Sequence, residues 1–309
     1  MTAIVRDDMI GVDAAVLEKS RVYCRELTQR EAKNFYYGLK LLPEPKRSAM
    51  YALYAYMRMV DDIADDESNG RTVAQRKGDL EQWEQLTHEA IHAGTEGNGS
   101  LPRGHILWPA FSEMVRRYRV PGHLFDDMIA GQRQDLEPVA IGTFQELHEY
   151  CYRVASVVGL ASLYVWGFEG GEATLKLSVD RGIAFQLTNV LRDLREDAAR
   201  GRCYLPREDL ERFGVSEREL AEGAGGAIPE GFLSLMRFEI ERAEGFYRSS
   251  ASLDEKVRAD SRPTLVAMTG IYRGILQKIA EDPTRVMRGR VRLSTFNKLM
   301  IGWRAMRGK

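Results

Sequence analysis

Hydrophobic residues recur along most of the chain at spacings of three, four and seven positions, the pattern of helices that bury one face. Alternating segments rich in Val and Ile, which would indicate strands, are scarce. Helix starts are also marked by two capping boxes, Thr143–Glu146 and Ser216–Glu219. The pattern therefore predicts an all-α chain that forms one domain over residues 1–309. Its predicted helices cover residues 17–40 (with a break), 46–66, 71–93, 105–118, 122–136, 144–168, 172–199, 206–222, 229–252, 259–281 and 291–306.

Two of these helices are hydrophobic on nearly every side. The first is Ala49–Ala64, which stays apolar until it meets Arg58 and a group of aspartates. The second is Tyr150–Phe168, in which Arg153 is the only charged residue. Helices of this kind either lie in the core of a large bundle or line an apolar cavity.

An acidic cluster ends the first of these helices. Asp61 and Asp65 are four residues apart and share a helix face, with Asp62 beside them and Arg58 one turn earlier. Like charges at this spacing destabilise an isolated helix by a few tenths of a kcal/mol, unless a cation lies between them. Carboxylate oxygens without nitrogen or sulfur ligands favour Mg²⁺.

A second set of oxygen-bearing side chains follows the hydrophobic part of helix 172–199. Asn189, Asp193 and Asp197 lie at i, i+4 and i+8 on one face, with Gln186 one turn before them. Arg192 flanks this ladder and is suited to a phosphate oxygen. Taken alone, each set also fits a solvated acidic surface.

The two sets together favour a more specific interpretation, because each begins at the end of an apolar helix. Facing each other across a bundle, they would form an acidic rim over an apolar cavity. The ligand that fits such a rim has a diphosphate head, bridged by Mg²⁺, and a long hydrocarbon tail. This predicts ionisation of an allylic C–O bond, with the carbocation protected from water.

Charge and cysteine content narrow the class of protein. The chain has 44 basic and 45 acidic residues and a net charge of −1, which excludes a basic nucleic-acid-binding domain. Its three cysteines form no CxxC pair, which excludes a disulfide scaffold and fits a reducing compartment. The N-terminus lacks the pattern of a signal peptide. The longest uncharged apolar stretch, Val154–Phe168, has 15 residues, fewer than the roughly 20 that span a membrane. We therefore expect a cytoplasmic protein with no nucleic-acid partner.

Two further features have competing interpretations. His88 and His92 match the HExxH motif of zinc metalloproteases, but no third ligand follows at a recognised spacing. We therefore expect an exposed helix end there. The segment Arg273–Lys309 has ten basic and two acidic residues. It is either a solvated helical surface, a contributor to diphosphate binding, or a peripheral contact with anionic lipid.

The chain resembles the squalene/phytoene synthase family from roughly Asn34 to Lys298. The stretches that carry the resemblance are NFYYGLKLLPEPKR, YALYAYMRMVDDIAD, GQRQDL, YCYRVASVVGL and FQLTNVLRDLREDAARGRCYLP. The resemblance implies an all-α isoprenoid synthase (class I terpenoid synthase) fold around a central apolar cavity. It also implies Mg²⁺ dependence and head-to-head condensation of two polyprenyl diphosphates through a cyclopropyl diphosphate.

The resemblance also implies roles for individual residues. Metal ligation is implied for Asp61, Asp62, Asp65, Asn189, Asp193 and Asp197. Diphosphate binding is implied for Arg58, Arg192, Arg290, Tyr272, Tyr204 and Gln186, and Tyr204 belongs to a flap, Gly201–Pro206. Tyr150 resembles a tyrosine near the reacting carbons, so the implied catalytic residues are Asp61, Asp65, Asp193, Asp197 and Tyr150. The chain departs from the family pattern at Ser156, where glycine is expected to face the cavity, and at Ala64, where some relatives carry an acid.

The substrate and the final product remain open at this point. Farnesyl diphosphate (C15), giving presqualene diphosphate or squalene, is favoured if bulky side chains shorten the pocket: Phe35, Tyr36, Tyr37, Tyr54 and Trp166. The alternative is geranylgeranyl diphosphate (C20), giving phytoene. NADPH is needed for squalene only, so its use is undetermined. More remote alternatives are a terpene cyclase or head-to-tail prenyltransferase, since Asp61–Asp65 also fits DDxxD, and a non-catalytic helical assembly protein.

Overall fold

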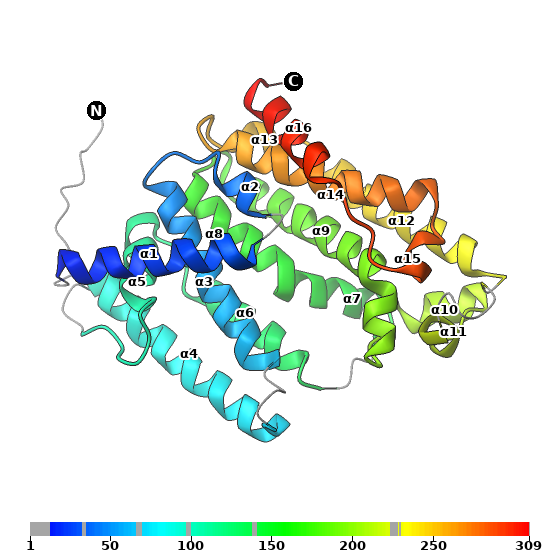
Figure 1. Cartoon of the computed structure of the whole chain (residues 1–309), viewed down its shortest axis with the longest axis horizontal. Helices are drawn as coiled ribbons and strands as arrows, with labels where there is room; N and C mark the ends of the chain where they lie inside the picture. The colour runs from blue at the N-terminus through cyan, green and yellow to red at the C-terminus, as the bar shows by residue number, and fades with distance from the viewer. Residues whose placement is uncertain are drawn as a thin grey trace.

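The computed structural model describes residues 13–32, 35–65, 70–96, 100–137, 141–222, 228 and 230–308. In these residues the structure is helical, with a single isolated β-bridge between Phe168 and Val257, so the all-α prediction is confirmed. The elements, labelled in Figure 1, are α1 (Ala14–Glu31), α2 (Phe35–Leu39), α3 (Lys46–Asp65), α4 (Val73–Glu96), α5 (Trp108–Tyr118), α6 (His123–Gln134), α7 (Phe144–Cys151), a π-helical turn (Tyr152–Ser156), α8 (Val157–Trp166), α9 (Gly171–Ala199), α10 (Arg207–Phe213), α11 (Glu217–Glu222), α12 (Phe232–Ser249), α13 (Leu253–Lys256), α14 (Arg262–Glu281), α15 (Arg285–Arg288) and α16 (Thr295–Met306).

The long helix α9 organises the bundle. It runs through the middle of the molecule and packs against α8, α12, α14 and the π-helical turn. Hydrophobic side chains form one core around α3, α5, α6 and α8, and a second core around α9, α12 and α14. The first core contains a cluster of rings in which Tyr56 stacks on Phe111 with centroids 4.6 Å apart. Ala49–Tyr56 of the first apolar helix are buried except Tyr54, as the pattern predicts for most of this segment.

Several helix boundaries differ from the prediction. The segment 206–222 is two helices, because Gly214 adopts a left-handed conformation (φ 63°) that ends α10. The segment 144–168 is interrupted by the π-helical turn. The short helices α13 and α15 were not predicted, since four residues are too few to show a hydrophobic period. Both capping boxes are present, with Thr143 and Ser216 each bonded to a glutamate three residues later.

The π-helical turn packs closely against α9. Ser156 is fully buried, and its hydroxyl donates to the backbone oxygen of Val179 at 2.8 Å. A Cβ on Gly182 would lie 2.4 Å from the Ser156 Cα, so glycine is required at that position. The expectation that Ser156 enlarges a side chain facing a cavity is therefore wrong, because this side chain points at the α9 backbone.

Within the described residues, no helix combines the length and hydrophobicity needed to cross a lipid bilayer.

Candidate functional site

The first acidic cluster lies at the C-terminal end of α3. Arg58 Nη2 contacts Asp62 Oδ1 at 2.5 Å, so the arginine forms its ion pair with Asp62. Asp61 points inward, and its Oδ1 accepts a hydrogen bond from Gln132 Nε2 of α6 at 2.6 Å. Burial raises the pKa of Asp61 to about 7, the nearby charges of Asp65 and Asp62 add to the shift, and Arg58 opposes it. Asp61 is therefore a partly buried carboxylate with Arg58 and three other carboxylates around it, Asp62, Asp65 and Asp135.

A small apolar cavity adjoins Asp61. Its volume is about 30 Å³, room for roughly one water molecule. It is lined by Asp61 and Gln132 together with Arg153 and the hydrophobic side chains Met57, Val60, Met128, Val154 and Val158. The carboxylate thus lies beside hydrophobic side chains of α3, α6, α8 and the π-helical turn.

The second set of oxygen-bearing residues lies in the C-terminal half of α9. Two arginines hold Asp193: Arg192 Nε donates to Oδ1 at 2.8 Å, and Arg290 Nε lies 2.9 Å from the same atom. Burial raises the pKa of Asp197 to about 6, and the charge of Asp193 adds to this shift. Arg290, from the segment after α15, therefore lies at the second acidic set.

Asn189 has an unsatisfied oxygen. Its Nδ2 donates to Gln186 Oε1 at 3.0 Å, whereas its buried Oδ1 has no hydrogen-bond partner among the described residues. Tyr272 of α14 stacks on Phe185 with centroids 4.4 Å apart, at 14°. Burial raises the pKa of Tyr272, and the charge of Arg192 opposes this. Gln186, Asn189, Arg192 and Tyr272 therefore belong to one neighbourhood.

Asp135, directly after α6, lies beside the first acidic set and the flap. Its Oδ2 accepts from the Tyr150 hydroxyl at 3.2 Å, and its Oδ1 accepts from the Tyr204 hydroxyl at 3.3 Å. Burial raises the pKa of Asp135 to about 6, and the two tyrosine hydrogen bonds oppose the rise. Asp61 and Asp65 both interact electrostatically with it. Asp135 was not among the predicted site residues. The available signal was its place in GQRQDL, three residues after Gln132.

Arg202, in the predicted flap, is a second residue that the sequence reasoning missed. Burial lowers the pKa of Arg202, but the charges of Tyr204, Asp135 and Asp65 outweigh this and raise it. Arg202 also lowers the pKa of Asp197. The guanidinium therefore interacts with Asp65 from the first acidic set and with Asp197 from the second, which means that the two sets border the same region.

The residues of the two sets suit a hard cation in chemistry. Within the described ranges, no three His, Cys, Asp or Glu side chains converge on one point as metal ligands do. Asp62 is paired with Arg58, and Asp193 is held by two arginines. The carboxylates of Asp61 and Asp197 and the unsatisfied oxygen of Asn189 are nevertheless the oxygen ligands that Mg²⁺ prefers. The donor set therefore fits Mg²⁺.

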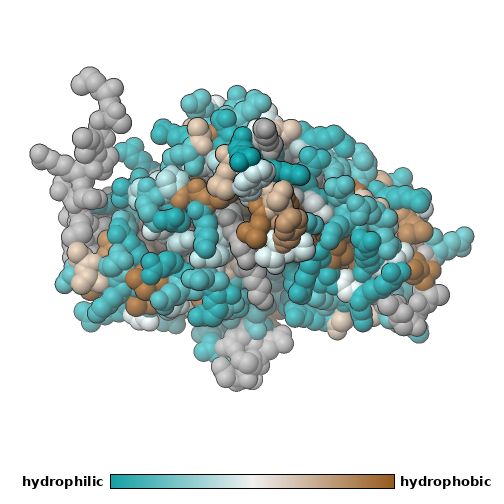
Figure 2. Space-filling model, turned by 45° about the horizontal axis from the view of Figure 1, so that its top comes forward, coloured by the Kyte–Doolittle hydropathy of each residue, from teal (hydrophilic) through white to brown (hydrophobic). Residues whose placement is uncertain are grey.

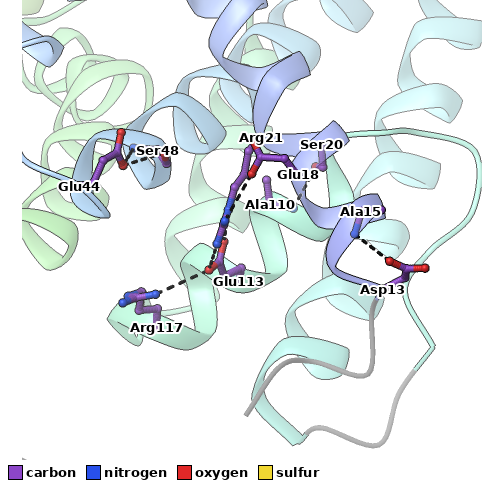
Figure 3. Close-up of polar contacts among 10 residues, drawn as sticks. All are labelled: Asp13, Ala15, Glu18, Ser20, Arg21, Glu44, Ser48, Ala110, Glu113 and Arg117. Atoms are coloured by element: carbon purple, nitrogen blue, oxygen red, sulfur yellow. Dashed lines mark hydrogen bonds and ion pairs between the residues drawn. The ribbon is translucent and has the colours of Figure 1, made fainter. Parts of the chain in front are cut away.

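A larger cavity, of about 580 Å³, lies elsewhere, between α1, the start of α3 and α5. Figure 3 shows its polar contacts: Arg21 and Arg117 reach the same carboxylate, Glu113, and Arg21 Nε donates to it at 3.0 Å. Glu44 in the same region accepts from the Ser48 hydroxyl at 2.7 Å. None of the predicted site residues lines this cavity.

The HExxH residues lie on α4. His88 Nε2 contacts Asp126 Oδ1 at 2.6 Å, and both side chains are more than 40% exposed (57% and 43%). His92 is exposed as well. As expected, the motif occupies an exposed part of a helix.

The bulky residues expected to shorten the pocket have other contacts. Trp166 is buried at the end of α8, where its backbone oxygen accepts from Lys46 Nζ at 2.6 Å. Tyr36 stacks on Tyr51, with centroids 6.3 Å apart. The side chains of Phe35 and Tyr37 lie outside the described residues. Trp166 and Tyr36 are engaged in these contacts, so neither supports a pocket shortened to C15 size.

Comparisons with known proteins extend over nearly the whole chain. The family model described as squalene/phytoene synthase matches residues 28–297. The chain is 36% identical over 292 residues to a phytoene synthase of Arthrospira platensis, with 90% of this chain and 89% of that protein covered. It is 34% identical over 296 residues to a 15-cis-phytoene synthase of Synechococcus elongatus, with 92% of each covered. A solved dehydrosqualene synthase in complex with ligand is similar with a TM-score of 0.79 and 28% identity, covering 94% of this chain and 97% of that one.

Proposed function

The chain belongs to the squalene/phytoene synthase family, and from this membership we propose that it condenses two molecules of geranylgeranyl diphosphate head to head to form phytoene. As a member of the family it is a prenyltransferase with the all-α fold of that family. The observation that carries the proposal is the meeting of two acidic helix segments around Asp135 and Arg202, beside apolar side chains.

The proposed C20 substrate replaces the C15 substrate that bulky residues favoured in the sequence. The relatives at 34–36% identity that cover about nine-tenths of this chain bear the name phytoene synthase. Two of the residues expected to shorten the pocket, Trp166 and Tyr36, are engaged in packing, which weakens the case for a C15 substrate. Head-to-head coupling of C20 chains to phytoene also needs no hydride donor, so we propose that NADPH is not used.

We assign diphosphate binding to the two acidic segments and their arginines. Asp61, Asp62 and Asp65 on α3, with Asn189, Asp193 and Asp197 on α9, would hold Mg²⁺, which when bound supplies positive charge to the diphosphate oxygens. Arg58, Arg192 and Arg290 already contact these carboxylates. In the presence of a diphosphate we expect these guanidinium groups to turn from the carboxylates to the phosphate oxygens, stabilising the leaving group.

Beyond the acidic rim, we assign protection of the carbocation to hydrophobic side chains. Met57, Val154 and Val158 lie beside Asp61 and bring no nucleophile to it. The stacked rings of Tyr150 and Tyr204 place aromatic faces next to Asp135. We propose that these rings stabilise cationic carbon by cation–π attraction as the cyclopropyl diphosphate forms and rearranges. Their hydroxyls donate to Asp135, which holds the two rings in place.

The proposal is tested by product analysis. Purified protein is incubated with Mg²⁺ and either geranylgeranyl or farnesyl diphosphate, with and without NADPH, and the extracts are analysed by mass spectrometry. We expect phytoene from the C20 substrate, at a rate that NADPH does not change. Faster turnover of the C15 substrate, or squalene formed only with NADPH, would contradict the assignment. A cyclised product from a single chain would indicate a terpene cyclase.

A further inference from the structure

The C-terminal helix α16 exposes an unusual number of large hydrophobic side chains. Four of them lie on this one helix: Phe296 (70% exposed), Leu299 (54%), Trp303 (44%) and Met306 (58%). Their spacings of three, four and three residues place them on one face. Figure 2 turns the side of the molecule that carries α16 toward the viewer and shows hydrophobic side chains gathered there, bordered by hydrophilic ones.

The opposite face of α16 anchors the helix to the bundle. Ile301 packs so closely on α14 that a Cβ on Gly270 would lie 2.7 Å from its Cγ2. Ala305, one turn later, is buried. Because this inward face is already occupied by α14, the outward stripe is not a core face that the helix failed to bury. It is a second hydrophobic face, held in a fixed orientation.

The charge around the stripe is positive. Within residues 295–309, the helix and the end of the chain, the sequence has four basic residues, Lys298, Arg304, Arg307 and Lys309, and no acidic residue. Arg304 on α16 and Arg307, directly after it, are both exposed, and the Arg307 guanidinium lies 3.9 Å from the centroid of the Trp303 ring. A hydrophobic stripe with tryptophan, bordered by basic residues, is the composition of helices that lie in the interface of anionic membranes.

We propose that α16 docks the protein on a membrane surface containing anionic lipid. The helix has 12 residues and so a length of about 18 Å, which suits lying on a bilayer and is too short to cross it. A second copy of the chain is a poorer occupant. A two-fold dimer through α16 would place the same basic residues opposite each other with no acidic partner from this segment.

The position of the stripe relates it to the proposed reaction. Arg290, which contacts Asp193, precedes Phe296 by six residues, so the two lie within about 20 Å of each other along even a fully extended chain. If the proposed function holds, a hydrocarbon product would leave the protein close to the lipid. Docking itself involves only the surface of α16, so it does not depend on which substrate the protein uses.

The test measures binding to vesicles without substrate. The full-length protein is sedimented with vesicles of phosphatidylcholine alone and of phosphatidylcholine with an equal share of phosphatidylglycerol, at low and high salt. We expect binding to the anionic vesicles, weakened by salt. The triple variant Phe296→Ala, Leu299→Ala, Trp303→Ala should bind the anionic vesicles at least roughly tenfold more weakly than the wild type. Arg304→Gln and Arg307→Gln should each weaken binding by up to about fivefold.

A matched control removes the same number of exposed hydrophobic side chains elsewhere: Val73→Ala, Ile106→Ala and Leu233→Ala. It should bind vesicles as the wild type does. Trp303 provides a direct probe, because the other three tryptophans are buried and its emission should shift to the blue on vesicle binding. Turnover in detergent should be the same for the α16 triple variant and the wild type, which separates docking from catalysis.

Three results would overturn the proposal. The first is failure of the wild type to bind anionic vesicles, and the second is equal binding by the wild type and the α16 triple variant. The third is a concentration-dependent dimer in sedimentation velocity that the triple variant abolishes, which would assign the stripe to a second copy of the chain. Loss of turnover of geranylgeranyl diphosphate with vesicle binding intact would contradict the proposed function and leave the docking surface in place.

Discussion

Tyr150 and Tyr204 stack with ring centroids 4.9 Å apart, at 23°, and their hydroxyls donate to different oxygens of the same carboxylate, Asp135. Tyr150 begins the last turn of α7, whereas Tyr204 belongs to the flap that follows α9. Asp135 therefore fastens the flap to the body of the bundle. Burial raises the pKa of Asp135 to about 6, which is still below neutral pH. At neutral pH Asp135 is therefore mostly ionised, and its two carboxylate oxygens accept the two hydroxyl hydrogen bonds.

This arrangement predicts coupled effects of substitution. Tyr150→Phe or Tyr204→Phe should each lower the free energy of unfolding at neutral pH by about 1 kcal/mol, because each removes one hydrogen bond to a buried carboxylate. In an Asp135→Asn background the same substitutions should cost less. Urea unfolding followed by circular dichroism measures the cycle. Tyr164→Phe, whose ring packs on Phe168, is the control and should change little. Strictly additive costs would contradict the shared role of Asp135.

The acidic segments predict a loss of turnover with the fold retained. Asp61→Asn and Asp193→Asn should each lower the rate of diphosphate consumption by about 100-fold or more, because each removes a charge proposed to hold Mg²⁺ against the leaving group. The rate of diphosphate release is the measurement, with far-ultraviolet circular dichroism as the check on folding. Asp79→Asn on α4, where Asp79 pairs with Arg71, is the control. Full activity in either variant would contradict the site assignment.

Local patterns account for the parts of this site that could be predicted from the sequence. Asp61 and Asp65, or Asp193 and Asp197, share a face because a helix repeats every 3.6 residues, and that holds wherever the helix lies. The resemblance to a family added Arg290, which only the folded chain brings to Asp193.

Other parts of the site depend on tertiary packing, and the sequence pattern does not contain them. Asp135 is important because Tyr150 and Tyr204 approach it from different segments. The π-helical turn lies where residue 156 meets Gly182 of α9, while the hydrophobic period of 144–168 is that of an uninterrupted helix. The hydrogen bond from Gln132 to Asp61 also joins two segments, α6 and α3, that are far apart in the sequence.

A buried cluster away from the site predicts a pH dependence of stability. Arg242 Nη1 contacts Glu239 Oε1 at 2.7 Å and Asp209 Oδ2 at 2.8 Å, so one guanidinium serves two buried carboxylates. Burial raises the pKa of Glu239 from 4.5 to about 7, with Arg242 opposing and Asp209 adding to the rise. The folded state therefore binds this proton more tightly than the unfolded state, and the contribution to stability is lost as pH rises from 4.5 to about 7.

Glu239→Gln tests this directly. The variant cannot ionise at this position, so the wild type should lose stability relative to Glu239→Gln between about pH 5 and about pH 8. Urea unfolding of both proteins at the two pH values gives the difference. Glu241 is an exposed residue of the same helix that pairs with Arg248. The free energy of unfolding of Glu241→Gln should change with pH as that of the wild type does. Parallel curves for Glu239→Gln and the wild type would show that Glu239 remains ionised in the folded protein.

The close approach of the π-helical turn to α9 predicts a steric effect at Gly182. An alanine Cβ there would lie 2.4 Å from the Cα, 2.7 Å from the Oγ and 2.8 Å from the backbone nitrogen of Ser156. Two of these atoms are backbone, so no change of rotamer relieves the clash. Gly182→Ala should therefore destabilise the protein by about 1–3 kcal/mol, the range for overpacked cores. Adding Ser156→Gly should restore only part of this, because it removes the Oγ and leaves the backbone contacts.

Gly78→Ala is the matched control, since Gly78 is exposed on α4 and a Cβ there would meet no atom within 4 Å. It should stabilise the protein by up to about 1 kcal/mol through helix propensity alone. Thermal or urea unfolding of the wild type and the three variants puts their stabilities on one scale. If Ser156→Gly fully rescued Gly182→Ala, the side chain and not the backbone would set the distance between the turn and α9. If Gly182→Ala behaved like Gly78→Ala, the two segments would be free to separate, and the π-helical turn would not be held by α9.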